Sequence, residues 1–251
     1  LKITTFLFFI LDFLYSSFID TINHLKLKIF MILHHLQNSR SQRILWLLEE
    51  LELYYEIKLH DATQARQTNL KFPTLDISHD TQTIRLTESS AIVEYLCQLH
   101  QKLIIPHDHT QYWNFCFYSH YSDASLMPNL ALKQVFQHIK QQTPLLVRFV
   151  SLAFQSSFNR AYLNPELHRQ LKEIDTHLST HSSFAGDVFS YADILMWFPL
   201  YAASYATPQF AQYNSIQHYF TQIQSRPAFN TAMTRGQWSA SYFEHYWSIT
   251  Q

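Results

Sequence analysis

The sequence is poor in glycine and cysteine, and each shortage excludes a class of protein. Gly186 and Gly236 are the only glycines, so no glycine-rich loop is available to hold a phosphate, and nucleotide-dependent enzymes are excluded. Cys97 and Cys116 are the only cysteines and form no CxxC pair, which excludes a disulfide framework and a cysteine-based zinc site. Such low cysteine use suits a reducing compartment, so we expect a cytoplasmic protein.

Charge is also scarce, and its distribution excludes two further kinds of partner. The formal net charge is −1, and only 15% of the residues are charged. The lysines and arginines are scattered, whereas nucleic-acid binding calls for a basic patch, so we expect no nucleic-acid partner. The 15 histidines are dispersed without HExxH spacing, so we expect no metal site.

The first 28 residues read as an apolar N-terminal extension of uncertain status. Ile3–Ile19 is broken by Asp12 and lacks a basic start and a small-residue cleavage pattern, so it is a poor signal peptide. Its length lies at the short limit for a membrane span, and membrane contact is expected only if this extension belongs to the native protein. The alternatives are an amphipathic helix packed on the body and a mis-set start upstream of Met31.

The pattern of apolar residues predicts the order strand, helix, strand, short irregular segment, two strands and helix in the first part of the chain. The strands are expected at Phe30–Leu36, Tyr54–Leu59, Pro73–Ile77 and Thr83–Leu86. A helix between the first two implies that they are parallel, and the polar residues Ser78–Gln82 indicate a hairpin between the last two. This order is thioredoxin-like, and beyond about His100 the periodicity is helical with no convincing strand.

We therefore expect an α/β plus all-α chain, with an N-terminal thioredoxin-like domain followed by a C-terminal helical bundle domain. A chain of 251 residues with 47% hydrophobic residues can bury the cores that this requires. The expected divisions are the extension 1–28, the first domain 29–101, a linker 102–110 and the helical domain 111–251.

The segment Met31–Leu51 carries the main functional signal, because a short apolar strand runs through a polar turn into a helix. Ser39 and Gln42 have the spacing of a capping box. Backbone N–H groups at a helix start converge on negative charge and the helix dipole adds to the attraction, so Ser39 lies where a thiolate would be stabilised. A plain helix cap is the alternative interpretation of Ser39.

Two further helix starts belong to the same pattern. Thr87–Leu99 begins with hydroxyl and acidic residues and continues with one apolar face, which makes a helix start suited to a carboxylate. Asp193 stands at the position that reaches back to the backbone of Ser190, at the start of a strongly apolar helix. The second of these predicts an internal cap in a buried helix.

Taken in order, these segments resemble one family. They are SRSQR, LLEEL, FPT, TESSAIVEYL, SLMP, FAGD, SYADILM and SRPAF. Their order and intervals are similar to those of the cytosolic glutathione S-transferases, in particular bacterial and fungal members with a serine at the first helix start. The resemblance covers nearly all of Phe30–Trp238. It implies a detoxifying homodimer that uses glutathione as co-substrate, needs no metal, and attacks a small apolar electrophile or reduces a peroxide.

The resemblance also implies roles for particular residues. Ser39 would be the catalytic serine that hydrogen-bonds the glutathione sulfur as thiolate. Phe72 and Pro73 match the residue and cis-proline that hold the cysteinyl part of glutathione, and Glu88 and Ser89 match the pair that binds its γ-glutamyl end.

Other implied roles lie in the second domain. Ser190 and Asp193 would be a structural cap, important for folding rather than chemistry. The electrophile is expected in a cleft between the domains, lined mainly by the helical one. The available side chains, each of a kind that more often serves core packing, are Tyr118, Tyr121, Ser125, Met127, Trp197 and Tyr201.

One departure from the family keeps a second function open. Relatives have a longer segment with a helix before the proline, whereas only His60–Lys71 is present here. A shortened wall would weaken glutathione binding, so the alternative is a non-catalytic binding or interaction module with the same fold. Thiol–disulfide exchange is excluded, because neither cysteine lies at the first helix start.

Overall fold

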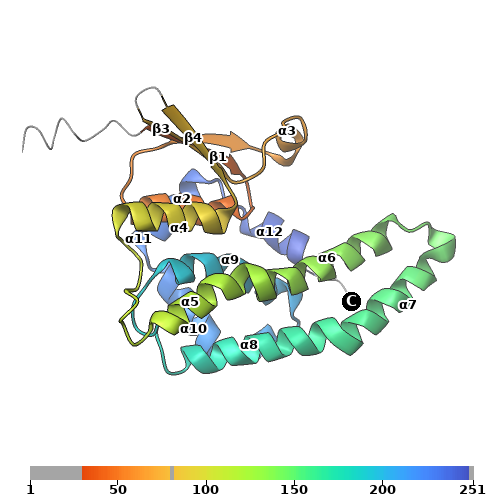
Figure 1. Ribbon diagram of the computed structural model, residues 1–251. Helices are drawn as coiled ribbons and strands as arrows, with labels where there is room; N and C mark the ends of the chain where they lie inside the picture. The colour runs from red at the N-terminus through yellow and green to blue at the C-terminus, as the bar shows by residue number, and fades with distance from the viewer. Residues whose placement is uncertain (1–29, 80–81, 249–251) are drawn as a thin grey trace, which may run out of the picture.

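A computed structural model of the chain describes residues 30–79 and 82–248, and it divides into a sheet-containing part and a helical part (Figure 1). The expected extension 1–28 lies outside the described residues. The sheet strands are β1 (Phe30–Leu36), β2 (Glu56–His60), β3 (Thr74–His79) and β4 (Gln82–Thr87). Their order is β2-β1-β3-β4, with β1 parallel to β2 and both other pairs antiparallel. The predicted thioredoxin-like strand order is confirmed, and β1 has the bounds that its sequence predicted.

The helices of the first part are α2 (Ser41–Glu50), α3 (Ala62–Arg66) and α4 (Ser89–His100). α2 and α4 lie side by side on one face of the sheet (Figure 1). The segment expected to be irregular contains α3, so that expectation is wrong. Asp61 accepts hydrogen bonds from the backbone of Gln64, whose side chain accepts from the backbone of Asp61 in return, and this capping box starts the helix.

The second part is helical, as predicted, within the described residues. Its elements are α5 (Tyr112–Tyr121), η1 (Ser122–Leu126), α6 (Met127–Gln142), η2 (Leu145–Val147), α7 (Arg148–Phe158), η3 (Asn159–Leu163), α8 (Asn164–Leu178), α9 (Tyr191–Ala206), η4 (Phe210–Gln212), α10 (Asn214–Gln224), α11 (Pro227–Arg235) and α12 (Ala240–Trp247). α9 is apolar around most of its circumference and is the buried centre of this part. α6 and α7 form a hairpin that projects away from the body (Figure 1). None of the helices in residues 30–79 and 82–248 has the length and hydropathy required to cross a bilayer.

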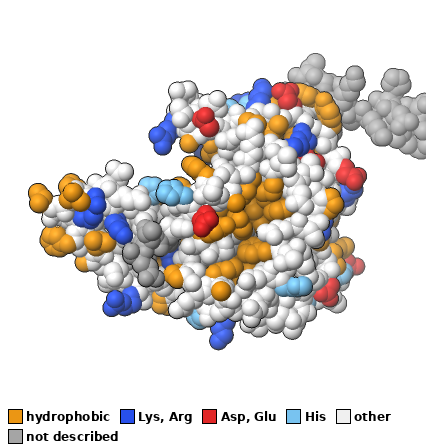
Figure 2. Space-filling view, turned by 180° about the vertical axis from the view of Figure 1, so that it is seen from behind, with side chains coloured by type: hydrophobic (Ala, Val, Ile, Leu, Met, Phe, Trp, Pro, Cys, Tyr) orange, Lys and Arg blue, Asp and Glu red, His pale blue; other side chains and the backbone are white. Residues whose placement is uncertain are grey.

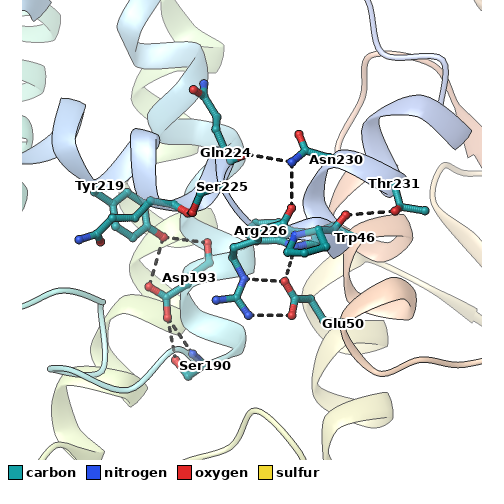
Figure 3. Close-up of polar contacts among 12 residues, drawn as sticks. Trp46, Glu50, Ser190, Asp193, Tyr219, Gln224, Ser225, Arg226, Asn230 and Thr231 are labelled. Carbon is teal, nitrogen blue, oxygen red and sulfur yellow. Dashed lines mark hydrogen bonds and ion pairs between the residues drawn. The ribbon is translucent and has the colours of Figure 1, made fainter.

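α11 fixes α2 against the helical part through a polar cluster (Figure 3). Arg226 donates to both carboxylate oxygens of Glu50 at 2.6 and 2.8 Å, and the Trp46 indole N–H donates to the same carboxylate at 2.8 Å. The Trp46 ring also packs edge-on against Phe229. α2 is therefore held between the sheet and the helical part.

Asp193 caps α9 from inside the protein (Figure 3). Its carboxylate is fully buried and accepts from the backbone N–H of Ser190 at 2.8 Å, that of Phe184 at 3.0 Å and the Tyr219 hydroxyl at 3.2 Å. Burial raises the pKa of Asp193 to about 6, and these hydrogen bonds limit the rise. The carboxylate organises the helix start and a neighbouring loop.

Candidate active site

A cleft of about 650 Å³ separates the sheet-containing part from the helical part. Its wall on the first side comes from the turn between β1 and α2, including Ser39, and from Ala62 of α3. Its wall on the second side comes from α6, α9 and α12, through Met127, Ala131, Gln134, Val135, His138, Ile139, Phe198, Tyr242, Tyr246 and Trp247. The serine therefore borders a mainly apolar space between the two domains.

The Ser39 side chain is fixed by the turn that carries it. Its hydroxyl donates to the Leu36 carbonyl at 2.8 Å, and its oxygen accepts from the Ser41 backbone N–H at 3.2 Å. The predicted capping box with Gln42 is wrong, because α2 begins at Ser41 with Arg40 as its N-cap. The Gln42 amide instead donates to the Ala232 carbonyl at 2.8 Å, so a contact between domains takes that side chain away from the helix start.

A series of close polar contacts runs from Ser39 into the protein. The Ser41 hydroxyl oxygen lies 2.9 Å from that of Ser39 and 2.9 Å from His35 Nδ1. His35 Nε2 lies 3.2 Å from the Gly236 carbonyl, which can only accept, so Nε2 is assigned the proton and Nδ1 accepts from Ser41. Burial lowers the pKa of His35 to about 4, so the ring is neutral near pH 7.

The turn between α11 and α12 holds the serine loop from the opposite side. The Asn38 side chain accepts from the Ser239 backbone N–H at 2.8 Å, and Gln37 donates to Gln237 at 2.6 Å. A Cβ atom on Gly236 would come within 2.4 Å of Gln42 Oε1 and 2.8 Å of Leu45 Cδ2, so a larger residue would have to displace these side chains of α2. The helical domain thereby positions the residue that faces the cleft.

Strand register places the other predicted glutathione residues at the same end of the sheet. Thr74 at the start of β3 pairs with His34 near the end of β1 and with Thr87 at the end of β4. Ser39 follows β1, Pro73 precedes β3 and Glu88 follows β4. The three segments therefore leave the sheet along one edge, where a single extended ligand could contact them.

The Phe72–Pro73 peptide bond is cis. Pro73 is buried, whereas Phe72 is half-buried with its ring against that of His60. Within residues 30–79 and 82–248, the N–H and carbonyl of Phe72 make no backbone hydrogen bond. An extended ligand could pair with them, as a neighbouring strand would.

Glu88 and Ser89 differ in their surroundings. Glu88 is exposed, has a φ of 66°, and lies 3.9 Å from the Lys71 ammonium. A positive φ is uncommon for a residue other than glycine, and Glu88 is one of several such residues in the described part of the chain. Ser89 is buried, and its hydroxyl accepts from Arg43 at 3.2 Å.

Arg43 joins this region to the helical domain, and these contacts were not anticipated from the sequence. It is fully buried and donates at 3.0 Å to each carboxylate oxygen of Asp123 and at 3.2 Å to the Ser122 hydroxyl. Those two residues begin η1, a π-helical turn, and such turns are frequent at functional sites. The available signal was an arginine within the apolar helix that follows Ser39.

The structure brings some of the predicted residues together and separates others. Ser39 lines the cleft, whereas Phe72, Pro73, Glu88 and Ser89 lie at the adjoining sheet edge but not in its lining. Of the electrophile candidates only Met127 lines the cleft. Tyr118, Tyr121 and Trp197 belong to the buried core, Tyr201 packs against it, and Ser125 lines a separate shallow pocket.

Several residues that line the cleft were not predicted from the sequence. His138, Tyr242 and Tyr246 were not anticipated, and α12 lies beyond the last recognised segment. Among the described residues, no group of three or more His, Cys, Asp and Glu side chains is arranged to hold a metal ion.

The described residues thus form a thioredoxin-like domain followed by a helical domain, with Ser39 at the cleft between them. A family model described as "Glutathione S-transferase, N-terminal domain" matches residues 33–102, and one described as "Glutathione S-transferase, C-terminal domain" matches residues 141–227. Glutathione S-transferase 3 of Schizosaccharomyces pombe is 34% identical over 204 residues, covering 79% of this chain and 84% of the relative. The chain therefore belongs to the glutathione S-transferase family, and the enzyme interpretation of its sequence is confirmed at the level of the family.

Other relatives agree on the fold. Glutathione S-transferase 1 of Saccharomyces cerevisiae is 27% identical over 229 residues, which cover 84% of this chain and 97% of the relative. A solved glutathione S-transferase from Actinobacillus pleuropneumoniae is 24% identical, with a TM-score of 0.63 over 87% of this chain and 100% of its own. A homologue from Lodderomyces elongisporus, solved with two GSH per subunit, has a TM-score of 0.64 at 16% identity over 82% of this chain and 98% of its own.

Proposed function

We propose that this protein is a glutathione transferase that holds the glutathione thiol as a thiolate at Ser39 and directs it at an electrophile in the cleft. A cysteine thiol has a pKa of about 8.5, and a hydrogen-bond donor aimed at the sulfur favours the charged form. The proton of a hydroxyl can rotate to any acceptor around its oxygen. Ser39 could therefore donate its hydrogen bond to a sulfur atom in the cleft in place of the Leu36 carbonyl. The thiolate is the stronger nucleophile.

The observation that carries this proposal is the position of Ser39 at the cleft, beside the sheet edge that bears Pro73 and Glu88. In the proposed complex, the backbone of Phe72 pairs with the cysteinyl part of glutathione. Glu88 and Ser89 bind its γ-glutamyl end, and the ammonium group of that end balances the exposed Glu88 carboxylate.

The chemistry of the cleft favours an apolar electrophile. Phe198, Tyr242, Tyr246 and the aliphatic residues of α6 form most of its wall on the helical side, while Gln134 and His138 supply polar atoms there. Burial of apolar surface would hold the substrate beside the sulfur. Reduction of a small organic peroxide needs the same thiolate and the same space, so we include it in the proposal, together with a role in detoxification.

The test is titration calorimetry with glutathione, combined with an assay of conjugation to an activated aryl halide. We expect saturable binding, weakened about tenfold or more in Glu88→Gln and Ser89→Ala, since tenfold corresponds to about 1.4 kcal/mol. Glu56→Gln, an exposed glutamate on the strand at the opposite edge of the sheet, is the matched control and should bind normally.

The alternative is a non-catalytic binding or interaction module, favoured by the short connection between β2 and β3. Because α3 fills this connection and Ala62 reaches the cleft wall, we favour the enzyme. Absence of saturable binding at millimolar glutathione would instead support the module.

We also propose a homodimer whose subunits meet through the projecting α6–α7 hairpin. Its tip exposes Leu146 to 90% and Phe149 and Phe154 to 69% each, and hydrophobic side chains interspersed with Lys and Arg gather there (Figure 2). Exposed apolar surface of this kind marks an interaction site. Leu146→Glu with Phe149→Glu should yield a monomer in sedimentation, whereas Tyr54→Glu, equally exposed on the other domain, should not.

We propose the cytoplasm as its location, because the two cysteines are unpaired and such cysteine use suits a reducing compartment. We also propose domain limits of 29–101 and 111–251 around a linker at 102–110. The last helix of the first part ends at His100 and the next begins at Tyr112, which supports these limits.

A further inference from the structure

The helical domain contains a second cavity, of about 790 Å³, whose lining includes several cationic side chains. The sequence has no acidic residue between Asp123 and Glu166, but it has four cationic ones, Lys133, Lys140, Arg148 and Arg160. α6 contributes Lys133 and Lys140 to the lining of this cavity, and η3 contributes Arg160. Three of the four cationic residues from this stretch of the sequence therefore line the same cavity.

Lys133 is buried without a counter-ion. Its residue is 4% exposed, and its ammonium donates to the neutral Asn164 side chain at 2.7 Å. It forms no ion pair with any described residue. Burial lowers the pKa of Lys133 to about 8, and an ammonium kept in such a place without a carboxylate costs free energy.

The described residues that line this cavity carry no negative charge. All of its lining residues lie in the described part of the chain, and none of them is acidic. Glu166 follows the lining residue Pro165, but its carboxylate is held by Arg169 at 2.9 and 2.6 Å. Lys140 and Arg160 likewise make no ion pair within the described residues.

The rest of the lining contains both polar and apolar side chains. Ser156, Asn159 and His168 supply polar groups to the wall. Apolar contacts are available from Leu152 and Pro165, so charge, hydrogen-bonding groups and apolar wall occur together.

We propose that this cavity binds a small organic anion whose carboxylate or phosphate group pairs with Lys133, with Lys140 and Arg160 at its rim. The site is separate from the catalytic cleft. α6 presents Gln134 and His138 to the cleft and Lys133 and Lys140, two helical turns apart on another face, to the cavity.

The test uses succinate, inorganic phosphate and the neutral analogue succinamide as probes, titrated calorimetrically into the full chain at constant ionic strength. Succinate or phosphate should bind saturably, and succinamide should bind at least tenfold more weakly. Lys133→Met and the double variant Lys140→Gln with Arg160→Gln should each weaken anion binding at least tenfold. The double variant changes partly or fully exposed residues, so it decides the matter if Lys133→Met does not fold.

Two controls separate this site from others. Lys172→Gln removes an exposed cation of α8 outside the cavity and should leave anion binding unchanged, as should Ser89→Ala in the proposed glutathione site. The proposal is overturned if neither anion binds up to about ten millimolar, if the cavity variants bind as well as the wild type, or if Ser89→Ala abolishes binding. Failure of glutathione binding alone would leave it standing, because the cavity does not depend on that site.

Discussion

Asp193→Asn should destabilise the fold in a manner that depends on pH. The wild-type carboxylate accepts hydrogen bonds from Ser190, Phe184 and Tyr219, all buried. The Asn amide keeps one acceptor oxygen and turns an NH₂ group toward donors, which leaves at least one buried N–H unsatisfied at about 1 to 3 kcal/mol. We expect a loss of about 3 kcal/mol in the free energy of unfolding, or roughly 10 °C in Tm for a chain of this size.

The pH dependence follows from the raised pKa of Asp193, about 6 in the folded protein. The folded state holds this proton more tightly than the unfolded chain, whose aspartate has a pKa of about 3.9, so the contribution is fully present below pH 4 and falls as pH rises through 6. Integration between pH 5 and pH 8 gives a fall of about 1.4 kcal/mol. The gap in stability between wild type and Asp193→Asn should therefore shrink by about that amount.

The assay is urea unfolding followed by tryptophan fluorescence at both pH values. Comparing each variant with wild type at the same pH cancels other titrating groups. Asp187→Asn is the matched control, because this exposed aspartate also accepts from a serine N–H, that of Ser182, and should cost less than about 1 kcal/mol. A gap that stayed constant or widened toward pH 8 would mean that the carboxylate is ionised throughout, and the reasoning would be wrong.

Further predictions concern the residues that support the serine loop and α2. Ser41→Ala should raise the thiol pKa of bound glutathione by about one unit, worth about 1.4 kcal/mol, with an unchanged KM; an unchanged spectrophotometric pKa would exclude Ser41 as a positioning residue. Glu50→Ala should cost about 2 kcal/mol, because it leaves Arg226 and the Trp46 indole without their acceptor, and a loss below 0.5 kcal/mol in urea unfolding would contradict this. The pKa of His35 is lowered to about 4 in the folded protein, so its contribution to stability is present above about pH 6.5 and is lost as pH falls through 4. In His35→Asn, the free energy of unfolding should therefore fall by up to about 3 kcal/mol less than in the wild type over this range. Acid-unfolding curves that coincide for the two proteins would refute this.

Local patterns predicted the elements whose residues interact within one segment. β1 has an apolar run bounded by a polar turn, and Ser190 with Asp193 forms its cap over a few residues. α3 was missed because its helix is short and exposed, although Asp61 and Gln64 carry a capping-box spacing. Strands and helix caps of this kind can be predicted from interactions between residues close together in the sequence.

Features that depend on distant segments could not be predicted in this way. Gln42 has the right spacing to cap α2, but a carbonyl of α11, 190 positions later, takes its amide. Arg43 looks like an interruption of an apolar helix until Asp123 and Ser89 are placed around it. Tyr242 and Tyr246 line the cleft, and the turn before α12 is hydrogen-bonded to the serine loop some 200 positions earlier.

The most direct measurement is the ultraviolet thiolate absorbance of glutathione bound to the wild type and to Ser39→Ala, followed as a function of pH. We expect the wild type to lower the thiol pKa by more than one unit from about 8.5, and Ser39→Ala to return it to the free value while still binding glutathione and keeping its thermal stability. Ser225→Ala, at the end of α10, should behave as wild type. Equal thiol pKa values for wild type and Ser39→Ala would contradict the assignment of the cleft serine as the group that holds the sulfur anion.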